Sequence, residues 1–283
     1  MMKFLNLYSN ISNLNTSITN IKKLLKKNQI IGGPEVEKFE YNFSKYVNSK
    51  YCISVANGTD ALEIAIESLK LPVDSEVIVP VNTWISAAEA VVRNNLKIVF
   101  CDINLLDYSI DLNDLKKKIN RKTKLIIPVH LYGVPSNMNE IIKLSKKYNI
   151  KIIEDCAQAH GSYIKNKHVG TFGDLGTFSF YPSKNLGCFG DGGAIITNNK
   201  KLSIICRRIK NHGSLSKYDH EVIGRNSRLD SIQAVILNNN LKKFKKSIKI
   251  KNRNVNLYLK KIKEIKKISF IKYNKNYINS HHQ

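Results

Sequence analysis

Short apolar runs alternate with segments of helical hydrophobic spacing along most of the chain. Seven runs have the composition and length of β-strands. They are Tyr51–Val55, Glu76–Val79, Lys97–Cys101, Leu125–Val129, Lys151–Glu154, Thr177–Tyr181 and Ala194–Thr197. Helical patterns separate most of these runs, and such alternation is typical of an α/β fold whose sheet is covered on both faces. We therefore predict a seven-stranded, mostly parallel sheet that binds ligands at the carboxyl ends of its strands.

A longer helical pattern lies near the C-terminus. Apolar residues recur at roughly helical spacing between Leu241 and Ile262, and lysines fill the positions between them. This pattern predicts a helix whose basic residues face solvent.

The formal charge of +24 is concentrated in the same region. From Leu241 to Gln283, fourteen Lys or Arg residues oppose the single acid Glu264, so +13 of the total lies in the last 43 residues. A basic excess is typical of proteins that bind nucleic acid or anionic membranes. Its concentration on one amphipathic segment favours a solvated helix face instead. A nucleic-acid-binding module acting through residues 241–283 remains the alternative.

Length and composition set broad limits. The chain has 283 residues, which is long for one domain and short for two full ones. Its start, MMKFLNLYSN, lacks the apolar stretch of a signal peptide, and no run approaches the ~20 apolar residues of a membrane span. We predict a cytoplasmic protein without membrane contact. Five scattered cysteines without metal-ligand spacing predict reduced thiols in or near strands, and no zinc site.

Two segments place an acid and a lysine directly after apolar runs. Asp155 lies in EDCAQAHGS, residues 154–162, and Lys184 lies in SFYPSKNLG, residues 179–187. Pyridoxal phosphate chemistry needs this pair, because a lysine amine holds the cofactor aldehyde covalently while a carboxylate keeps the pyridine nitrogen protonated. The plain alternatives are a turn-capping aspartate and a surface lysine.

A third segment could bind a phosphate. A β-rich run ends at Val55, a turn is centred on Asn57 and Gly58, and a helical pattern follows. Free amides at a helix start favour anions, so Gly58 and Thr59 are candidate phosphate ligands. Ordinary N-capping by Asn57 or Thr59 is the alternative.

Seven motifs occur together in a fixed order. They are IGGPEVEKFE (31–40), ANGTDAL (56–62), VPVNTWISAAEAV (79–91), IPVHLYG (127–133), EDCAQAHG (154–161), GDLGTFSFYPSKNLGCFGDGGAI (173–195) and NHGSLSKYDHEVIGRNSRLDSIQA (211–234). On these motifs the chain resembles the DegT and StrS family of nucleotide-sugar aminotransferases. The resemblance implies the large domain of the aspartate-aminotransferase-like fold of pyridoxal-phosphate-dependent transferases.

The resemblance also implies a domain plan. Residues 1–235 would form the cofactor-binding large domain with an N-terminal helical segment. Residues 236–283 would form a basic connecting helix and the start of a small C-terminal domain. Family members usually continue further, so we expect most of that small domain to be missing from this chain.

Roles for individual residues follow from the resemblance. Lys184 would anchor the cofactor and transfer the proton, and Asp155 would pair with the pyridinium nitrogen. Gln158 would hydrogen-bond the cofactor's phenolic oxygen, and Trp84 would stack on the ring, with a core position as the alternative. The phosphate would be bound by the Gly58 and Thr59 amides, by the Ser179 hydroxyl and by Asn226 from a neighbouring subunit.

The same resemblance implies substrates and assembly. We expect amino transfer from glutamate to a 3-keto or 4-keto sugar linked to dTDP or UDP, in surface polysaccharide biosynthesis. A homodimer with shared sites is implied, in which Lys217 to Arg228 reaches towards the partner's substrate. His130 and His160 are expected to be structural.

Two other functions remain open. Some relatives carry histidine in place of the lysine and act as dehydrases, which Lys184 argues against. The second alternative is a catalytically incomplete fragment or regulatory remnant of the same family.

Overall fold

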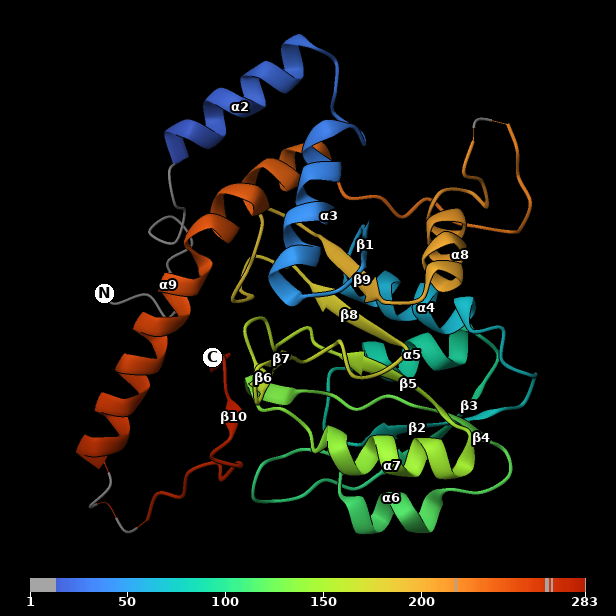
Figure 1. Ribbon diagram of the computed structural model, residues 1–283, viewed down its shortest axis with the longest axis vertical. Helices are drawn as coiled ribbons and strands as arrows, with labels where there is room; N and C mark the ends of the chain where they lie inside the picture. The colour runs from blue at the N-terminus through green and yellow to red at the C-terminus, as the bar shows by residue number, and fades with distance from the viewer. Residues whose placement is uncertain (1–13, 217, 263–264, 266, 283) are drawn as a thin grey trace.

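The computed structural model describes residues 14–216, 218–262, 265 and 267–282. Its centre is a seven-stranded sheet with the order β1-β9-β8-β5-β4-β2-β3 (Figure 1). The strands are β1 (Tyr51–Val55), β2 (Glu76–Pro80), β3 (Lys97–Cys101), β4 (Thr123–Ile126), β5 (Lys151–Asp155), β8 (Leu175–Ser179) and β9 (Gly193–Thr197). Strand β9 runs antiparallel to both neighbours, while the pairs from β8 to β3 are parallel. The predicted mostly parallel sheet is confirmed.

Five strands differ in their bounds from the prediction. Strands β2 and β5 end one residue later and β9 begins one residue earlier, whereas the ends of β4 and β8 are displaced by two or three residues. Strand β4 ends at Ile126 and not at Val129, because the chain reaches Pro128, which has no N–H to donate to a neighbouring strand. Strand β8 begins at Leu175, two residues early, because Leu175 and Gly176 pair with β5. Glycine is rare in strands, so this start carried no sequence signal.

Helices cover both faces of the sheet (Figure 1). They are α2 (Leu14–Lys26), α3 (Pro34–Val47), α4 (Gly58–Ser68), α5 (Ser86–Arg93), α6 (Leu112–Lys118), α7 (Met138–Tyr148), α8 (Lys200–Lys210) and α9 (Ser231–Ile262). One buried core joins the sheet to α4, α5 and α8, and the other joins it to α3, α7 and α9. Alternate residues of one strand enter opposite cores, such as Ile152 and Ile153 of β5, which explains the continuously apolar strands.

Helix α9 confirms the predicted C-terminal helix. Phe244 is buried, whereas Lys242, Lys245 and Lys249 are exposed, so its basic residues there face solvent. The domain boundary expected after residue 235 falls within this helix and stays a prediction.

A small second sheet lies beside the main one. Strands β6 (Tyr163–Ile164) and β7 (Lys167–His168) form a hairpin, and β10 (Tyr277–Ile278) pairs with β6. Figure 1 shows this C-terminal stretch between the lower half of α9 and the β6–β7 hairpin. The last described residues are thereby held against the carboxyl edge of the main sheet.

All five cysteines are buried and free, as predicted. Among the described residues, no helix combines the length and the apolar character needed to cross a bilayer.

A buried carboxylate connects α3, β1 and α8 just before the turn at Asn57. Glu40 accepts hydrogen bonds from the Ser54 amide and hydroxyl, both at 2.8 Å, and from Arg207 at 2.7 Å. Lys210 lies 3.5 Å away. Burial alone would raise the pKa of Glu40, but the charges of Lys210 and Arg207 outweigh it and hold the pKa below 4.5.

We expect Glu40→Gln to lower the free energy of unfolding by about 2 kcal/mol at pH 7, since hydrogen bonds to a charged group are lost. A depressed folded-state pKa stabilises the fold above pH 4.5, and this stabilisation is lost as pH falls through the folded pKa. The difference between variant and wild type should therefore shrink in urea titrations below pH 4.5. Glu37→Gln, on the exposed face of α3, is the control, and an equal loss there would contradict the assignment.

Candidate active site

The turn before α4 presents free amides. Asn57 Oδ1 accepts the Asp60 N–H at 2.8 Å, so the capping alternative is correct for Asn57. This cap leaves the amides of Gly58 and Thr59 at the open helix end, where no intrahelical acceptor exists. The Thr59 hydroxyl lies 2.7 Å from the Ser86 hydroxyl. Capping and anion binding are thus compatible at one helix start.

Ser179, the last residue of β8, lies directly against this turn. A Cβ added at Gly58 would lie 2.7 Å from the Ser179 Cβ and 3.3 Å from its hydroxyl oxygen. Only glycine therefore allows α4 to begin this close to β8. The contact brings together Gly58, Thr59 and Ser179, three donors suited to one phosphate.

Asp155 is fixed at the end of β5. Its N–H donates to Pro128 O at 2.9 Å, and its Oδ1 accepts the Ala157 N–H at 2.9 Å. Burial raises the pKa of this carboxyl, while the Ala157 N–H and the charges of Lys184 and His130 oppose the rise. One carboxylate oxygen caps a turn, so the capping alternative is observed, and the charge of Lys184 acts on the same carboxylate.

Lys184 is half-buried in the loop after β8. Its backbone N–H donates to Tyr181 O at 2.8 Å, and burial lowers the pKa of its ammonium group, opposed by Asp155. Each group thus influences the ionisation of the other. The structure brings the two predicted residues into one electrostatic environment, from segments 29 positions apart in the chain.

Gln158 is oriented by a strained turn. Its Oε1 accepts the Tyr132 N–H at 2.8 Å, and Tyr132 itself has a left-handed φ of 56°. Because a backbone N–H can only donate, the accepting atom must be the amide oxygen. The Gln158 Nε2 is then the side chain's remaining donor, which suits a phenolic oxygen.

Trp84 and Asn226 lie at the surface. Trp84 is 74% exposed, which rules out the alternative of a core position. Asn226 is exposed and forms an isolated bridge with Asn211, and Ser227 next to it accepts the Ala56 N–H at 3.1 Å. Within the described part of the chain, no recorded contact joins Trp84 or Asn226 to Lys184.

The segment expected to reach a partner projects from the body. Lys217 lies outside the described residues, but Tyr218 is 83% exposed and Ile223 is 93% exposed. In Figure 1 this stretch forms the orange loop that extends beyond α8.

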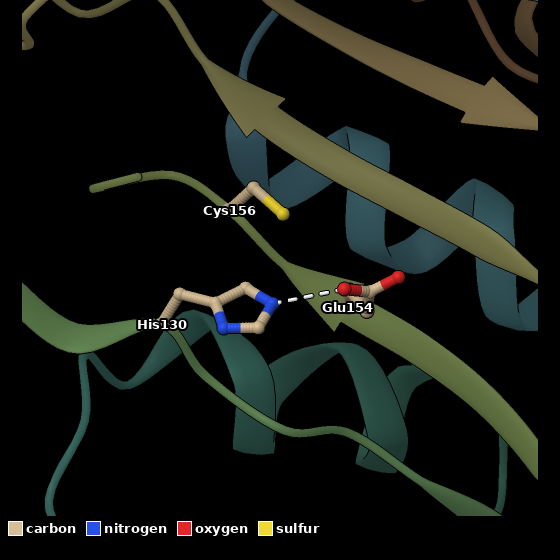
Figure 2. A group of neighbouring side chains, drawn as sticks. All are labelled: His130, Glu154 and Cys156. Carbon is tan, nitrogen blue, oxygen red and sulfur yellow. Dashed lines mark hydrogen bonds and ion pairs between the residues drawn. The ribbon is translucent and has the colours of Figure 1, made fainter. Parts of the chain in front are cut away.

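Glu154 is a site residue that the sequence analysis missed. Its side chain is fully buried, and its two oxygens accept the amides of Gly170, Phe172 and Gly173 at 2.7–2.8 Å. Its Oε2 also lies 3.0 Å from His130 Nε2 (Figure 2). A charged residue within the apolar strand KIIED was the available signal, because a buried charge requires partners.

The partners of His130 fix its tautomer. Nδ1 accepts the Ser136 N–H at 3.0 Å, so Nε2 carries a proton and donates to Glu154. Cys156 Sγ lies nearby, and these three side chains are close enough to hold a metal ion (Figure 2). Burial raises the pKa of the Cys156 thiol well above its ordinary value, which keeps the thiol protonated. These hydrogen bonds fix the chain on either side of Asp155. His130 therefore has the structural role that was expected for it.

His160 is packed against aromatic rings, and the structural role expected for it stays a prediction. It is fully buried, and its ring centroid lies 5.4 Å from Phe178 and 5.7 Å from Phe180. Neither ring nitrogen has a partner within normal hydrogen-bond geometry among the described residues, and the Ser179 backbone is the smallest influence on the pKa of the ring. Burial, followed by the charge of Lys184, holds the pKa of His160 well below its usual value, so the ring is neutral.

The chain is similar to known proteins along most of its length. The model of the DegT/DnrJ/EryC1/StrS aminotransferase family matches residues 13–283. One similar protein is UDP-N-acetyl-3-dehydro-alpha-D-glucosamine 3-aminotransferase of Acidithiobacillus ferrooxidans, which is 43% identical over 220 residues. The match covers 78% of this chain and 60% of that relative, so the chain matches about three fifths of its relative's length.

Two solved structures are similar over nearly the whole chain. DesV from S. venezuelae, in complex with a ketimine intermediate, is 33% identical with a TM-score of 0.95, covering 99% of this chain and 76% of DesV. NtdA from Bacillus subtilis with the bound cofactor PMP is 30% identical with a TM-score of 0.89, covering 99% of this chain and 65% of NtdA. The chain belongs to the DegT/DnrJ/EryC1/StrS aminotransferase family.

Proposed function

We propose that this protein is a pyridoxal-phosphate-dependent aminotransferase that moves an amino group from glutamate to the keto group of a nucleotide-linked sugar. The observation that supports this most strongly is that Asp155 and Lys184 each influence the pKa of the other, at the edge of the sheet where Ser179 packs against Gly58. Family membership makes amino transfer the expected reaction class.

The chain's residues fit the cofactor in charge and in hydrogen-bonding groups. Gly58, Thr59 and Ser179 would bind its phosphate, Asp155 would pair with its ring nitrogen, and Gln158 would donate to its phenolic oxygen. When bound, pyridoxal phosphate supplies a ring that accepts electrons from the substrate carbon. Trp84, which is exposed beside this site's strand edge, would cover the ring.

Lys184 would anchor the cofactor and move the proton. An amine must be neutral to act as nucleophile or base, and burial favours that form by lowering the pKa of Lys184. Asp155 must instead be ionised to pair with the ring nitrogen. Burial raises its pKa, and a cationic ring nitrogen would restore the ionised form. Burial therefore suits Lys184 to act as a neutral amine, and a cationic ring nitrogen would keep Asp155 ionised.

The substrate is proposed from a relative's name. The Acidithiobacillus protein is named as a 3-aminotransferase of a UDP-linked 3-dehydro sugar. We infer a UDP- or dTDP-linked 3-keto sugar as the acceptor, with a 4-keto sugar as the second possibility, in surface polysaccharide biosynthesis. A cytoplasmic homodimer is part of the same proposal, in which Asn226 and the exposed loop around Tyr218 reach the neighbouring subunit's site.

The first experiment asks whether the chain binds the cofactor and accepts nitrogen. Purified protein is incubated with pyridoxal phosphate, reduced with borohydride and mapped by mass spectrometry, which should place one pyridoxyl group on Lys184. Unreduced protein given glutamate alone should release about one equivalent of 2-oxoglutarate per site. Turnover should then require a keto-sugar.

The outcomes separate the candidate functions. Turnover with UDP- or dTDP-linked keto-sugars supports the proposal, and the preferred sugar reports the keto position. Elimination of water without nitrogen transfer would indicate a dehydrase. A folded chain without label or 2-oxoglutarate would contradict the proposal and favour a regulatory remnant.

A further inference from the structure

The residue that follows Lys184 is held from two distant parts of the chain. Asn185 Oδ1 accepts a hydrogen bond from Lys251 Nζ of α9 at 2.7 Å, and Asn185 Nδ2 donates to Ser280 O at 2.9 Å. An ammonium can only donate and a carbonyl can only accept, so the two contacts fix the orientation of this amide. The loop that carries Lys184 is therefore connected to both α9 and the C-terminal stretch.

Lys251 differs from the other lysines of α9. It is half-buried, and burial lowers its pKa. Among the described residues no carboxylate lies within ion-pair distance of it, so the cost of partial burial is not offset by an opposite charge. Its recorded partner is Asn185. The ammonium group of Lys251 therefore holds the loop that contains Asn185, and it does not form a surface ion pair.

The C-terminal stretch continues the connection to the opposite side of the site. Ser280 N donates to Ser162 Oγ at 3.2 Å, and Ser162 Oγ donates to Gly133 O at 2.6 Å. His282 N donates to Tyr132 O at 3.0 Å. The Tyr132 N–H in turn orients Gln158. Hydrogen bonds, joined by the backbone of residues 280–282 and of Tyr132, thus connect Lys251 to the side-chain amide of Gln158, which is proposed to contact the cofactor.

Close packing at Gly133 supports the same path. Its φ of +84° is in the left-handed region, and an added Cβ would lie 2.6 Å from Ser280 Oγ and 2.7 Å from Asn279 Oδ1. Glycine is required both by the turn and by the approach of residues 279–281. Residues 279–281 therefore pack directly against the turn at Gly133.

We propose that Lys251, acting through Asn185, is a positioning residue that fixes the Lys184 loop against residues 279–282 and so sets Lys184 relative to Gln158. This inference rests on the proposed function for the chemical role of Lys184. We call the contacts of Asn185 with Lys251 and Ser280 the clamp. The clamp does not depend on any cofactor, because all its contacts lie within the chain.

The test uses one substitution, one conservative substitution and one matched control. Lys251→Met keeps the length and apolar stem of the side chain but removes the donor, while Lys251→Arg keeps a charged donor. Lys249→Met makes the same change at an exposed position of the same helix. Asn185→Ala removes the clamp from its other end.

Two measurements are made on each variant. The first is amide hydrogen exchange of residues 181–188 in the cofactor-free protein, which should become about tenfold faster in Lys251→Met and Asn185→Ala, the effect of one hydrogen bond to a charged group. The second is the rate at which Lys184 becomes borohydride-trappable with limiting pyridoxal phosphate, which should fall by about the same factor. Lys251→Arg should be close to wild type in both, and Lys249→Met unchanged.

The double variant distinguishes a shared clamp from two separate effects. If Lys251 acts through Asn185, adding Lys251→Met to Asn185→Ala should cause no loss beyond that of Asn185→Ala alone. Additive losses, wild-type exchange in Lys251→Met or an equal loss in Lys249→Met would overturn the proposal. Failure of the wild type to take up label would instead count against the proposed function, and hydrogen exchange would still decide whether the clamp exists.

Discussion

Lys184→Ala is expected to abolish covalent attachment of pyridoxal phosphate and to reduce amino transfer by at least about 10³-fold. General acid–base catalysis alone is worth about 10²- to 10⁴-fold, and the variant loses the nucleophile as well. The proposed phosphate donors Gly58, Thr59 and Ser179 are untouched, so the cofactor should still bind reversibly. The measurement is borohydride labelling, followed by single-turnover release of 2-oxoglutarate from glutamate.

Two further variants make this result specific. Lys184→Arg keeps a positive charge beside Asp155, but a guanidinium stays protonated and cannot attack an aldehyde, so it should be as inactive as Lys184→Ala. Lys249→Ala removes an exposed lysine of α9 and should be fully active. Labelling of another lysine with full turnover in Lys184→Ala would show that the reactive amine was wrongly assigned.

The arrangement of strands was predictable because it depends on a local pattern. Buried strands are apolar on both faces, and that property marked every strand of the sheet except the edge strand β3, which is partly exposed and was marked by its β-rich composition. The errors occurred where the pattern is locally interrupted. Gly176 hid the start of β8, and Pro128 shortened β4.

The chemistry of the site was predictable for residues that stand in recognisable motifs. Asp155 and Lys184 follow apolar runs, and each is the only residue of its type in its motif that the proposed chemistry could use. Glu154 gave a weaker signal as a charge inside a buried strand. Its partners are amides of residues 170–173, and backbone donors leave no trace in residue types.

The clamp on Asn185 could not be predicted. Its contacts join residues 66 and 95 positions apart, through side chains that are common throughout the chain. The sequence pattern assigned Lys251, like the many other lysines of this helix, to a solvent-exposed face. Only its burial and its orientation towards Asn185 distinguish it from Lys249.

Asp155→Asn is expected to separate catalysis from stability. Removing one preorganised electrostatic contact typically costs about 10²- to 10³-fold in rate, and the neutral amide can no longer hold a proton on the ring nitrogen. The amine of Lys184 is retained, and loss of the Asp155 charge favours its neutral form, so borohydride should still attach a pyridoxyl group to it. Retained label with slow transfer would distinguish this variant from Lys184→Ala, and full transfer would contradict the assigned role of Asp155.

The stability of the cofactor-free variant should move in the opposite direction. Burial raises the folded-state pKa of Asp155 above its ordinary 3.8, so the ionised side chain costs stability once pH exceeds that value. Asparagine carries no charge and its Oδ1 can still accept the Ala157 N–H, so unfolding of the variant at pH 7 should need as much urea as the wild type, or more. The advantage should disappear below pH 3.8, where the wild-type carboxyl is protonated in both states. A less stable variant at pH 7 would mean that Asp155 is held mainly by its fit to the β5 turn. A more stable one would show a carboxylate kept at a cost to the fold, as expected if Asp155 serves to bind a cationic ligand.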